Sequence, residues 1–484
     1  MRLRDLLPLP AAADVALEGA MLAAVEAGRV AHALGQGATW RPGEPLRLLL
    51  VGYLGTRNTG ADVRVSELVR QVRHVLGDAH VALTAVTSDA RLSAGYFPGV
   101  EQVRLPDLYP PFLLRETGRH HGVIACEGSM FKSTFANALT TLMAGALGLA
   151  VARNQLAVGW GAEAGRMDAA LEAFVARTCR GALVLCRNEP SRDILARLGV
   201  RTTGGTDTAW TFEPDPPEVG AGLLRAAGWD GRAPVLVVCP VNPYWWPVRP
   251  RAGRALLDRA RGATPDDHYR ALYYHDFGPE DRARFERYLD ALAAAVGPFA
   301  RARGAFVALV GMERLDRRAC AALADRLGGA PALVSDEHDM FRLVSVLRRA
   351  RWLVSSRYHA LVCATPGGVP GVGVTFDERI RNLLEGRGQA DLCLAADDPA
   401  LALRLADALE RLERERDALA GAVLGTLPGE LEAMGGMGLD FADEVARRCP
   451  GLPLRALARD PWAHLPPLGP QLEAALARAA GAPG

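Results

Sequence analysis

Arg357 and His359 stand two positions apart in SSRYHA (355–360), directly after an apolar run that is typical of a buried strand. Residues at positions i and i+2 of an extended chain share a face, so we expect both side chains to reach one ligand. A guanidinium group recognises carboxylates and phosphates, and an imidazole can carry a proton near neutral pH. A lone histidine is more often structural, but Arg357, Ser355, Ser356 and the GGVPGVGV turn that follows favour an anion site with acid–base capacity.

Other polar residues also follow predicted strands, where the ligands of open parallel sheets bind. Arg187 comes directly after LVLC, and it either pairs with an acid such as Glu189 or Asp193 or holds an anion. The turn GYLGTRNTGAD (52–62) either cradles an anion or only connects a strand to a helix. In YWWP (244–247) the aromatic rings either stack on a sugar or pack at an interdomain seam, which we slightly favour. The residues expected to line the acceptor side or the cleft are Asn58, Asp62, Ser129, Asp207 and Trp245.

Short apolar runs alternate with amphipathic helical segments along most of the chain, which predicts parallel sheets covered by helices on both faces. We expect two Rossmann-like α/β domains with helical extensions at both ends. The predicted boundaries are a helical N-terminal extension (1–45), a first domain (46–212), a Pro-rich linker (213–232), a second domain (233–395) and a helical C-terminal extension (396–484). This last segment either packs back across the first domain or forms a partner face, so a homo-oligomer stays an open option.

Composition narrows the classes of function. The chain has 484 residues, 49% hydrophobic and 23% charged, and 56 basic residues against 55 acidic ones give a net charge of +1. Without a basic stripe, nucleic acid is not an expected partner. Pro and acidic residues interrupt the N-terminus, and the run at 138–152 is too short to cross a bilayer, so we expect a cytoplasmic protein without a transmembrane segment. We expect no metal and no cofactor, because even the best candidate cluster, DDHYRALYYHD (Asp266 to Asp276), is more typical of a solvated helix face.

A series of motifs resembles the polysaccharide pyruvyl transferase family, in the family's order over roughly residues 46–395. The motifs are GYLGTRNTG, CEGSMF, CRNEPSRDILARLGV, TDTAWTF and SSRYHALVCATPGGVPGVGVTFDERIRNLLE. The resemblance implies a two-domain fold similar to GT-B glycosyltransferases. It also implies transfer of a pyruvyl group from phosphoenolpyruvate (PEP), a co-substrate, to two hydroxyls of a sugar or glycoconjugate. The product would be a cyclic ketal and phosphate, as in polysaccharide biosynthesis.

The resemblance also implies roles for individual residues. The R-x-H element of the family binds and activates PEP, which implies Arg357 and His359 here, and the family's further donor contacts map to Arg187 and Arg379. We therefore expect His359 to act as general acid/base and Arg357 and Arg187 to clamp the carboxylate and phosphate. Arg379 is expected as a further phosphate contact, with Ser356 beside the donor.

The chain departs from the family pattern in two places. Gly60-Ala61-Asp62 replaces a turn that usually ends in Asp-Glu, and Cys126-Glu127-Gly128-Ser129 replaces a run of glycines. A carboxylate at Glu127 would repel the donor phosphate, so we expect Glu127 to face the acceptor and accept a hydroxyl proton. The alternative is that Glu127 caps the following helix.

Two further functions stay open at this stage. One is a GT-B glycosyltransferase that uses a nucleotide sugar, for which Asp377 and Glu378 could hold a ribose. The other is a catalytically silent family member that serves as a scaffold.

Overall fold

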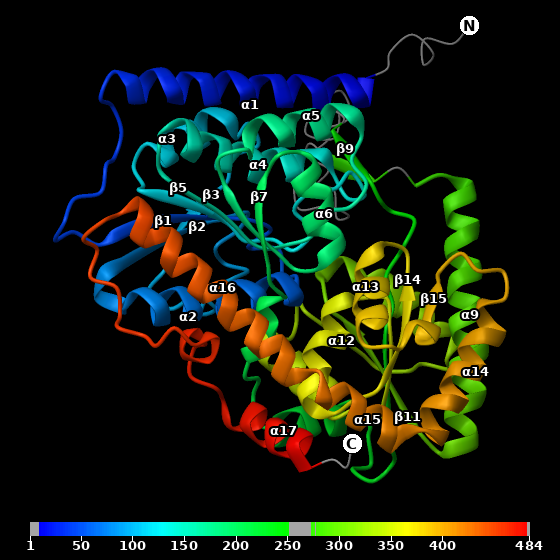
Figure 1. Ribbon diagram of the computed structural model, residues 1–484. Helices are drawn as coiled ribbons and strands as arrows, with labels where there is room; N and C mark the ends of the chain where they lie inside the picture. The colour runs from blue at the N-terminus through cyan, green and yellow to red at the C-terminus, as the bar shows by residue number, and fades with distance from the viewer. Residues whose placement is uncertain (1–8, 251–272, 276, 482–484) are drawn as a thin grey trace, which may run out of the picture.

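The computed structural model describes residues 9–250, 273–275 and 277–481 and contains two parallel β-sheets (Figure 1). The first sheet has the strand order β3-β2-β1-β4-β5-β6-β7, and every neighbouring pair in it is parallel. Its strands are apolar where they are central, and LRLLLV of β1 and LAVGWGA of β5 are almost wholly buried. The strands are β1 (Leu46–Val51), β2 (Val81–Thr87), β3 (Glu101–Arg104), β4 (Gly122–Ala125), β5 (Leu156–Ala162), β6 (Leu183–Cys186) and β7 (Arg201–Gly204).

The second sheet repeats this architecture with the order β12-β11-β8-β13-β14-β15, again with parallel pairs only. The strands β9 and β10, which come between β8 and β11 in the sequence, form a separate short antiparallel ribbon. The strands are β8 (Val235–Cys239), β9 (Val248–Pro250), β10 (Tyr273–His275), β11 (Phe306–Gly311), β12 (Ala332–Val334), β13 (Trp352–Ser355), β14 (Gly371–Thr375) and β15 (Cys393–Ala395).

Helices cover both sheets, as the alternating pattern predicts. The N-terminal helix α1 (Leu9–Ala33) adds an outer layer, because it packs mainly on the helices α3, α4 and α5 (Figure 1). The helices of the first half are α2 (Thr59–Leu76), α3 (Pro110–Thr117), α4 (Asn137–Ala152), α5 (Ala169–Thr178) and α6 (Glu189–Arg197). Those of the second half are α9 (Pro279–Arg303), α10 (Arg317–Arg326), α11 (Met340–Arg348), α12 (Tyr358–Ala364) and α13 (Glu378–Gly386). The predicted linker region contains a helix, α7 (Pro217–Ala226), that packs against α11.

The strand order of each sheet reverses at one point, between β1 and β4 in the first sheet and between β8 and β13 in the second. Such switch points are where open α/β sheets bind ligands. The segments that follow the strands touch one another across the domain boundary: the Thr59 amide donates to the Met312 carbonyl (2.8 Å), and the Ser335 hydroxyl donates to the Arg57 carbonyl (2.6 Å). The fold therefore brings the ligand-binding edges of both sheets together.

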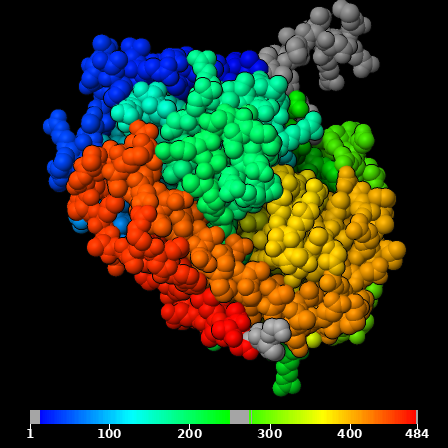
Figure 2. Space-filling view, viewed as in Figure 1, coloured from blue at the N-terminus to red at the C-terminus, as the bar shows by residue number. Residues whose placement is uncertain are grey.

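The C-terminal helices return to the first domain, which is one of the two arrangements expected for them. After α14 (Leu401–Arg414), which packs on α9, and α15 (Arg416–Gly425), the long helix α16 (Leu427–Arg448) crosses to β5 and α2. Phe441 of α16 meets Trp160 with ring centroids 4.9 Å apart. The last helix, α17 (Pro470–Gly481), packs against α15, and together these helices form a band along one face of both domains (Figure 2).

The predicted fold class is thus confirmed as two parallel-sheet α/β domains with helical extensions. None of the helices in the described part of the chain is both long enough and apolar enough to cross a membrane.

Candidate active site

A cleft that is partly open to solvent lies between the carboxyl ends of the two sheets, and its empty space is about 900 Å³ when the space open to solvent is included. Strand-end segments of both domains contribute to it, as the switch-point argument predicts. Its polar lining is formed by Tyr53, Asn58, Ser88, Glu127, Ser129, Glu313, Arg357 and Arg379. The cleft therefore combines two guanidinium groups with two carboxylates.

Arg357 is held in the cleft by two buried acids of the second domain. Its Nε lies 2.9 Å and its terminal nitrogen 2.5 Å from the Asp316 carboxylate, and the same terminal nitrogen lies 2.7 Å from Glu313. Tyr53 of the first domain donates to Glu313 as well (3.1 Å). Although burial disfavours its charge, these carboxylates raise the pKa of Arg357 above its usual value. Burial raises the pKa of Asp316 to about 6, against the lowering influence of Arg357.

Arg379 is the second guanidinium of the cleft and stands at the start of α13. Its Nε lies 2.6 Å from a carboxylate oxygen of Asp377, the residue that caps this helix. The guanidinium lies over the Phe135 ring at 4.6 Å from its centroid. Asp377 and Phe135 thus hold Arg379 from the two domains, through an ion pair and a cation–π contact.

Glu127 lies in the cleft with one oxygen unpaired. Its Oε1 accepts a hydrogen bond from the Ser129 amide (3.3 Å), while its buried Oε2 has no hydrogen-bond partner among the described residues. The alternative that Glu127 caps a helix is wrong, because α4 begins at Asn137 after Ala136. Asp62 lies deeper, and burial raises its pKa well above the usual range, with Glu313 and Glu127 acting in the same direction and Arg57 opposing them.

Arg357 and His359 do not share a face, because the extended geometry expected for them is absent. Strand β13 ends at Ser355 and α12 begins at Tyr358, so the chain turns between the two residues. The His359 ring lies against Gly60, where an added Cβ would come within 2.1 Å of Nδ1. Its Nε2 is 3.4 Å from the Asp207 carboxylate. Burial lowers the pKa of His359, and Asp207 opposes that shift.

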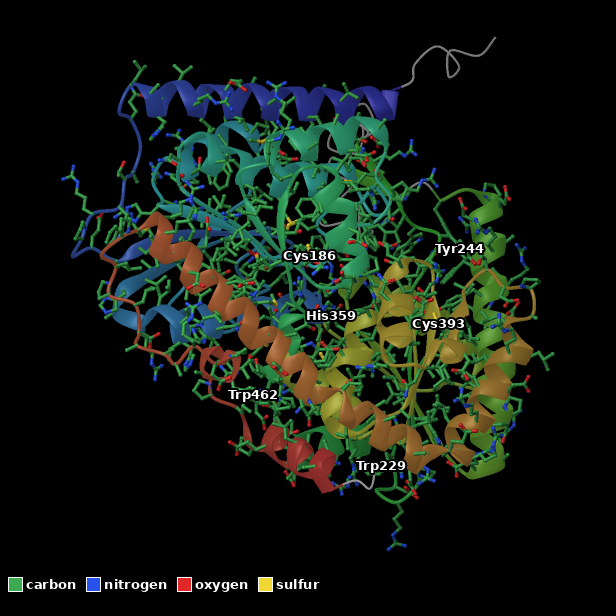
Figure 3. All side chains as sticks on the ribbon, viewed as in Figure 1. Cys186, Trp229, Tyr244, His359, Cys393 and Trp462 are labelled. Atoms are coloured by element: carbon green, nitrogen blue, oxygen red, sulfur yellow. The ribbon has the colours of Figure 1, made fainter. Side chains whose placement is uncertain are left out.

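Although His359 is not among the described residues that line the cleft, it lies at the domain boundary (Figure 3). It shares Asp207 with Arg187, so the two predicted residues are neighbours.

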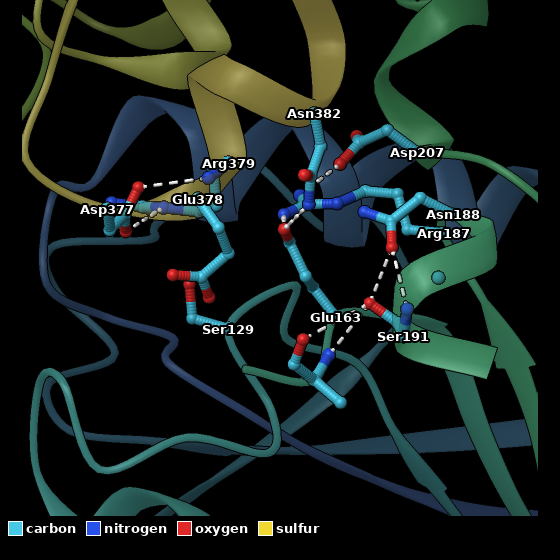
Figure 4. Close-up of polar contacts among 12 residues, drawn as sticks. Ser129, Glu163, Arg187, Asn188, Ser191, Asp207, Asp377, Glu378, Arg379 and Asn382 are labelled. Carbon is cyan, nitrogen blue, oxygen red and sulfur yellow. Dashed lines mark hydrogen bonds and ion pairs between the residues drawn. The ribbon is translucent and has the colours of Figure 1, made fainter. Parts of the chain in front are cut away.

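Arg187 pairs with acids of its own domain, which is one of the two outcomes expected for it. The acids are Glu163, in a very close contact, and Asp207 at 3.0 Å, rather than Glu189 or Asp193 (Figure 4). The Tyr358 ring covers the guanidinium at 4.3 Å from its centroid. Asp207 also binds the Nε of buried Arg64 (3.0 Å), and these cations hold the pKa of Asp207 well below its usual range, against the effect of burial.

The remaining predicted residues divide between the cleft and the domain interior. Asn58 caps α2 by accepting from the Ala61 amide (3.1 Å) and lines the cleft, as Ser129 does. Ser356 bonds the Tyr288 hydroxyl (2.8 Å) in the second domain. Trp245 packs on His275 with ring centroids 4.7 Å apart, and its neighbour Trp246 lines the cleft instead.

Several residues of the site were not predicted from the sequence. Glu313 and Asp316 stand in GMERLD, directly after β11, so their position after a strand was a usable signal. Lys132 is fully buried and forms an ion pair with Glu378 across the domain boundary (2.5 Å). A second contact crosses the same boundary, because the Asn382 side chain donates a hydrogen bond to Glu163 (3.0 Å). Burial lowers the pKa of Lys132, and Asp377 and Glu378 oppose that effect.

Metal ligands do not cluster in the part of the chain that the structure describes. Most of the segment from Asp266 to Asp276, including both ends, lies outside the described residues.

Solved structures show similarity in fold. A Listeria monocytogenes protein assigned as a UDP-N-acetylglucosamine 2-epimerase aligns with a TM-score of 0.52 and 11% identity, covering 83% of this chain and 96% of its own. Another UDP-N-acetylglucosamine 2-epimerase gives a TM-score of 0.50 at 11% identity, covering 84% and 97%. The glycosyltransferase of kitacinnamycin gives 0.45 at 15% identity, covering 85% and 100%. At these identities the two epimerase structures support the fold alone.

Comparison with curated proteins gives no sequence match. The sequence model of the polysaccharide pyruvyl transferase family, in contrast, matches residues 154–378. The matched region runs from the start of β5 to the start of α13 and contains Arg187, Asp207, Arg357 and His359, whereas Glu127 precedes it and Arg379 follows it directly. The family indicated by the motifs is thus the one whose model matches this chain, over residues 154–378.

Proposed function

We propose that this protein transfers the pyruvyl group of PEP to two hydroxyls of a sugar or glycoconjugate, forming a ketal and releasing phosphate. The observation that carries the proposal is the pair Arg357 and Arg379 in one cleft at the switch points of both sheets. The family match of residues 154–378 supports the same reaction class. PEP offers a carboxylate and a phosphate, which are the anions that guanidinium groups bind in bidentate geometry.

In this proposal the donor competes with internal acids for the arginines. Arg357 is already oriented by Asp316 and Glu313, so little side-chain entropy is lost when an anion replaces one of these contacts. Arg187 is not assigned to the donor, because Glu163, Asp207 and the Tyr358 ring occupy its surroundings. This narrows the donor contacts expected from the motifs to Arg357 and Arg379.

The reaction balances with acid–base chemistry alone. A proton adds to C3 of PEP, and one acceptor oxygen bonds to C2. The C2–O bond to phosphate then breaks, and the second acceptor oxygen bonds to C2. Of the two hydroxyl protons, one replaces the proton delivered to C3 and the other leaves with the phosphate.

Two side chains are proposed to move these protons. Glu127 accepts a hydroxyl proton, because its buried Oε2 faces no hydrogen-bond donor among the described residues and the side chain lines the cleft. His359 delivers the proton to C3. Because its ring now rests on Gly60 and faces Asp207, this role requires the ring to leave Gly60 when the donor binds.

The test is phosphate release from PEP in the presence of a panel of sugars, with the ketal identified by NMR. Arg379→Ala is expected to abolish release, and Arg349→Ala is the matched control, because Arg349 is exposed and does not line the cleft. Thermal unfolding in the presence of each donor gives a second test. A rise in the midpoint temperature with a UDP-sugar but not with PEP would contradict the proposal and favour a glycosyltransferase.

A further inference from the structure

One wall of the cleft is apolar and adjoins the Arg379 guanidinium. It is formed by the start of α4 with the loop before it, by the segment after β3, and by the second domain around β9. The side chains that form it include Leu105, Phe135, Leu139, Leu142, Trp246 and Val248. We call this set the apolar wall.

The apolar wall is assembled from both domains and fixed to the polar part of the cleft. The Trp246 and Phe135 rings meet edge to face with centroids 5.2 Å apart, and the Val248 amide donates to the Phe135 carbonyl (2.8 Å). Phe135 also carries Arg379 over its ring. The Phe135 ring thus belongs to the apolar wall and also contacts the proposed donor-binding Arg379, so a ligand at Arg379 lies next to apolar surface.

Neither PEP nor an unsubstituted sugar accounts for this wall. PEP has only one methylene group, which is small against a surface formed by several aliphatic and aromatic side chains. A sugar carries hydroxyls around its ring, and a hydroxyl placed against Leu105 or Leu142 would lose its water without gaining a partner. Apolar surface beside a reacting centre is removed from water only when an apolar group of the ligand covers it.

We propose that the acceptor carries an alkyl, acyl or aryl group close to its reacting hydroxyls, and that this group packs on the apolar wall. This inference rests on the proposed function and names the acceptor class as an amphipathic glycoconjugate. The division of the cleft carries it: polar and charged groups face the hydroxyls and the donor, while apolar groups from both domains face the substituent.

The experiment compares methyl and hexyl glycosides of the same sugars, both in binding without PEP and in PEP-dependent phosphate release. Each methylene that is buried contributes roughly a fourfold gain in affinity. We expect hexyl glycosides to bind at least tenfold more tightly than methyl glycosides. Leu139→Gln should remove most of this difference, because Leu139 is a half-buried member of the wall. Leu403→Gln is the control, since Leu403 is an exposed leucine (67%) on α14.

The outcomes separate this inference from the proposed function. Equal affinity for methyl and hexyl glycosides, or a preference for hexyl that Leu139→Gln leaves unchanged, would overturn the amphipathic acceptor whether or not PEP is consumed. A hexyl preference that depends on Leu139 supports it. If that preference is found but no glycoside supports phosphate release, the proposed pyruvyl transfer fails while the apolar subsite stands.

Discussion

Arg187 and Arg357 each stand close behind a buried strand, one in each domain, and yet they differ in what they can bind. Each directly follows or nearly follows a buried strand, and each pairs with two carboxylates of its own domain. The Arg187 side chain is 3% exposed and covered by Tyr358, whereas the Arg357 side chain is 13% exposed and lines the cleft. Asp207 is shared with Arg64 and His359 as well, so the Arg187 cluster forms a closed network.

This difference shows that an arginine just after a strand lies near the ligand-binding edge of the sheet. Its position in the sequence does not decide whether it binds a ligand or a carboxylate of the protein. At Arg187 the protein supplies the anions, and the result is a link among β5, β6 and the segment after β7. Arg357 also pairs with carboxylates of the protein, but its side chain lines the cleft as well. We therefore expect the two arginines to differ in their contributions to stability and to binding.

The largest effect is expected for Arg187→Ala. Glu163 and Asp207 both pair with Arg187, so its removal takes this cation away from two buried carboxylates. Breaking a buried ion pair typically costs about 3–5 kcal/mol, so the free energy of unfolding should fall by that amount. Denaturant titration measures it, with exposed Arg349→Ala as the control. A loss below about 1 kcal/mol, typical of an exposed pair, would show that the Arg187 network is not closed.

A smaller, pH-dependent effect is expected for Arg357→Ala. The pKa of Asp316 is already raised to about 6, and the lost guanidinium no longer lowers it. A carboxyl whose pKa is raised in the folded state stabilises the protein at low pH and loses that contribution as pH rises through the folded pKa. We therefore expect a loss of about 1–3 kcal/mol at pH 8 and a smaller loss near pH 5. Denaturant titrations at both pH values measure it, and a loss independent of pH would contradict this description of the cluster.

The smallest effect is expected for His359→Gln, because His359 contacts only the Asp207 carboxylate of the Arg187 cluster among the described ion pairs. Burial lowers the pKa of His359, so between that value and its ordinary value near 6.5 the unfolded chain binds more protons than the folded one. The stabilising contribution is present above about pH 6.5 and is lost as pH falls towards the folded pKa. The midpoint temperature of thermal unfolding should fall less steeply between pH 7.5 and 5.5 in His359→Gln than in the parent protein. An equal decline would show that Asp207 holds His359 in its charged form.

Much of the fold was predictable because strand and helix periodicity is local. The alternation of LRLLLV-type strands with amphipathic helices predicted both domains, and position after a strand predicted Arg357, Asn58 and Ser129 near the ligand edge. Arg379 and Glu127, which also line the cleft, were predicted from the family resemblance and from a departure from its pattern. The turn between Ser355 and Tyr358 was missed, because an Arg-x-His spacing fits an extended chain as well as a helix start.

What the sequence could not predict depends on contacts between distant segments. Trp245 and Trp246 are adjacent, and only the packing of β9 and β10 decides that Trp246 enters the cleft. The partners of Arg187 stand 24 and 20 positions away, at the ends of neighbouring strands, whereas the acids nearest in sequence are not its partners. Lys132 and Glu378 meet only because the two domains close on each other.

The most direct test of the account is calorimetric titration of PEP into the parent protein, Arg379→Ala and Arg187→Lys. We expect the parent protein to bind PEP, and we expect Arg379→Ala to weaken binding by about tenfold to a hundredfold, as the loss of a charged hydrogen bond implies. Arg187→Lys, which keeps the charge beside Asp207, should retain the affinity. If Arg187→Lys lost PEP binding while Arg379→Ala kept it, the donor would lie at the Arg187 cluster and not in the cleft.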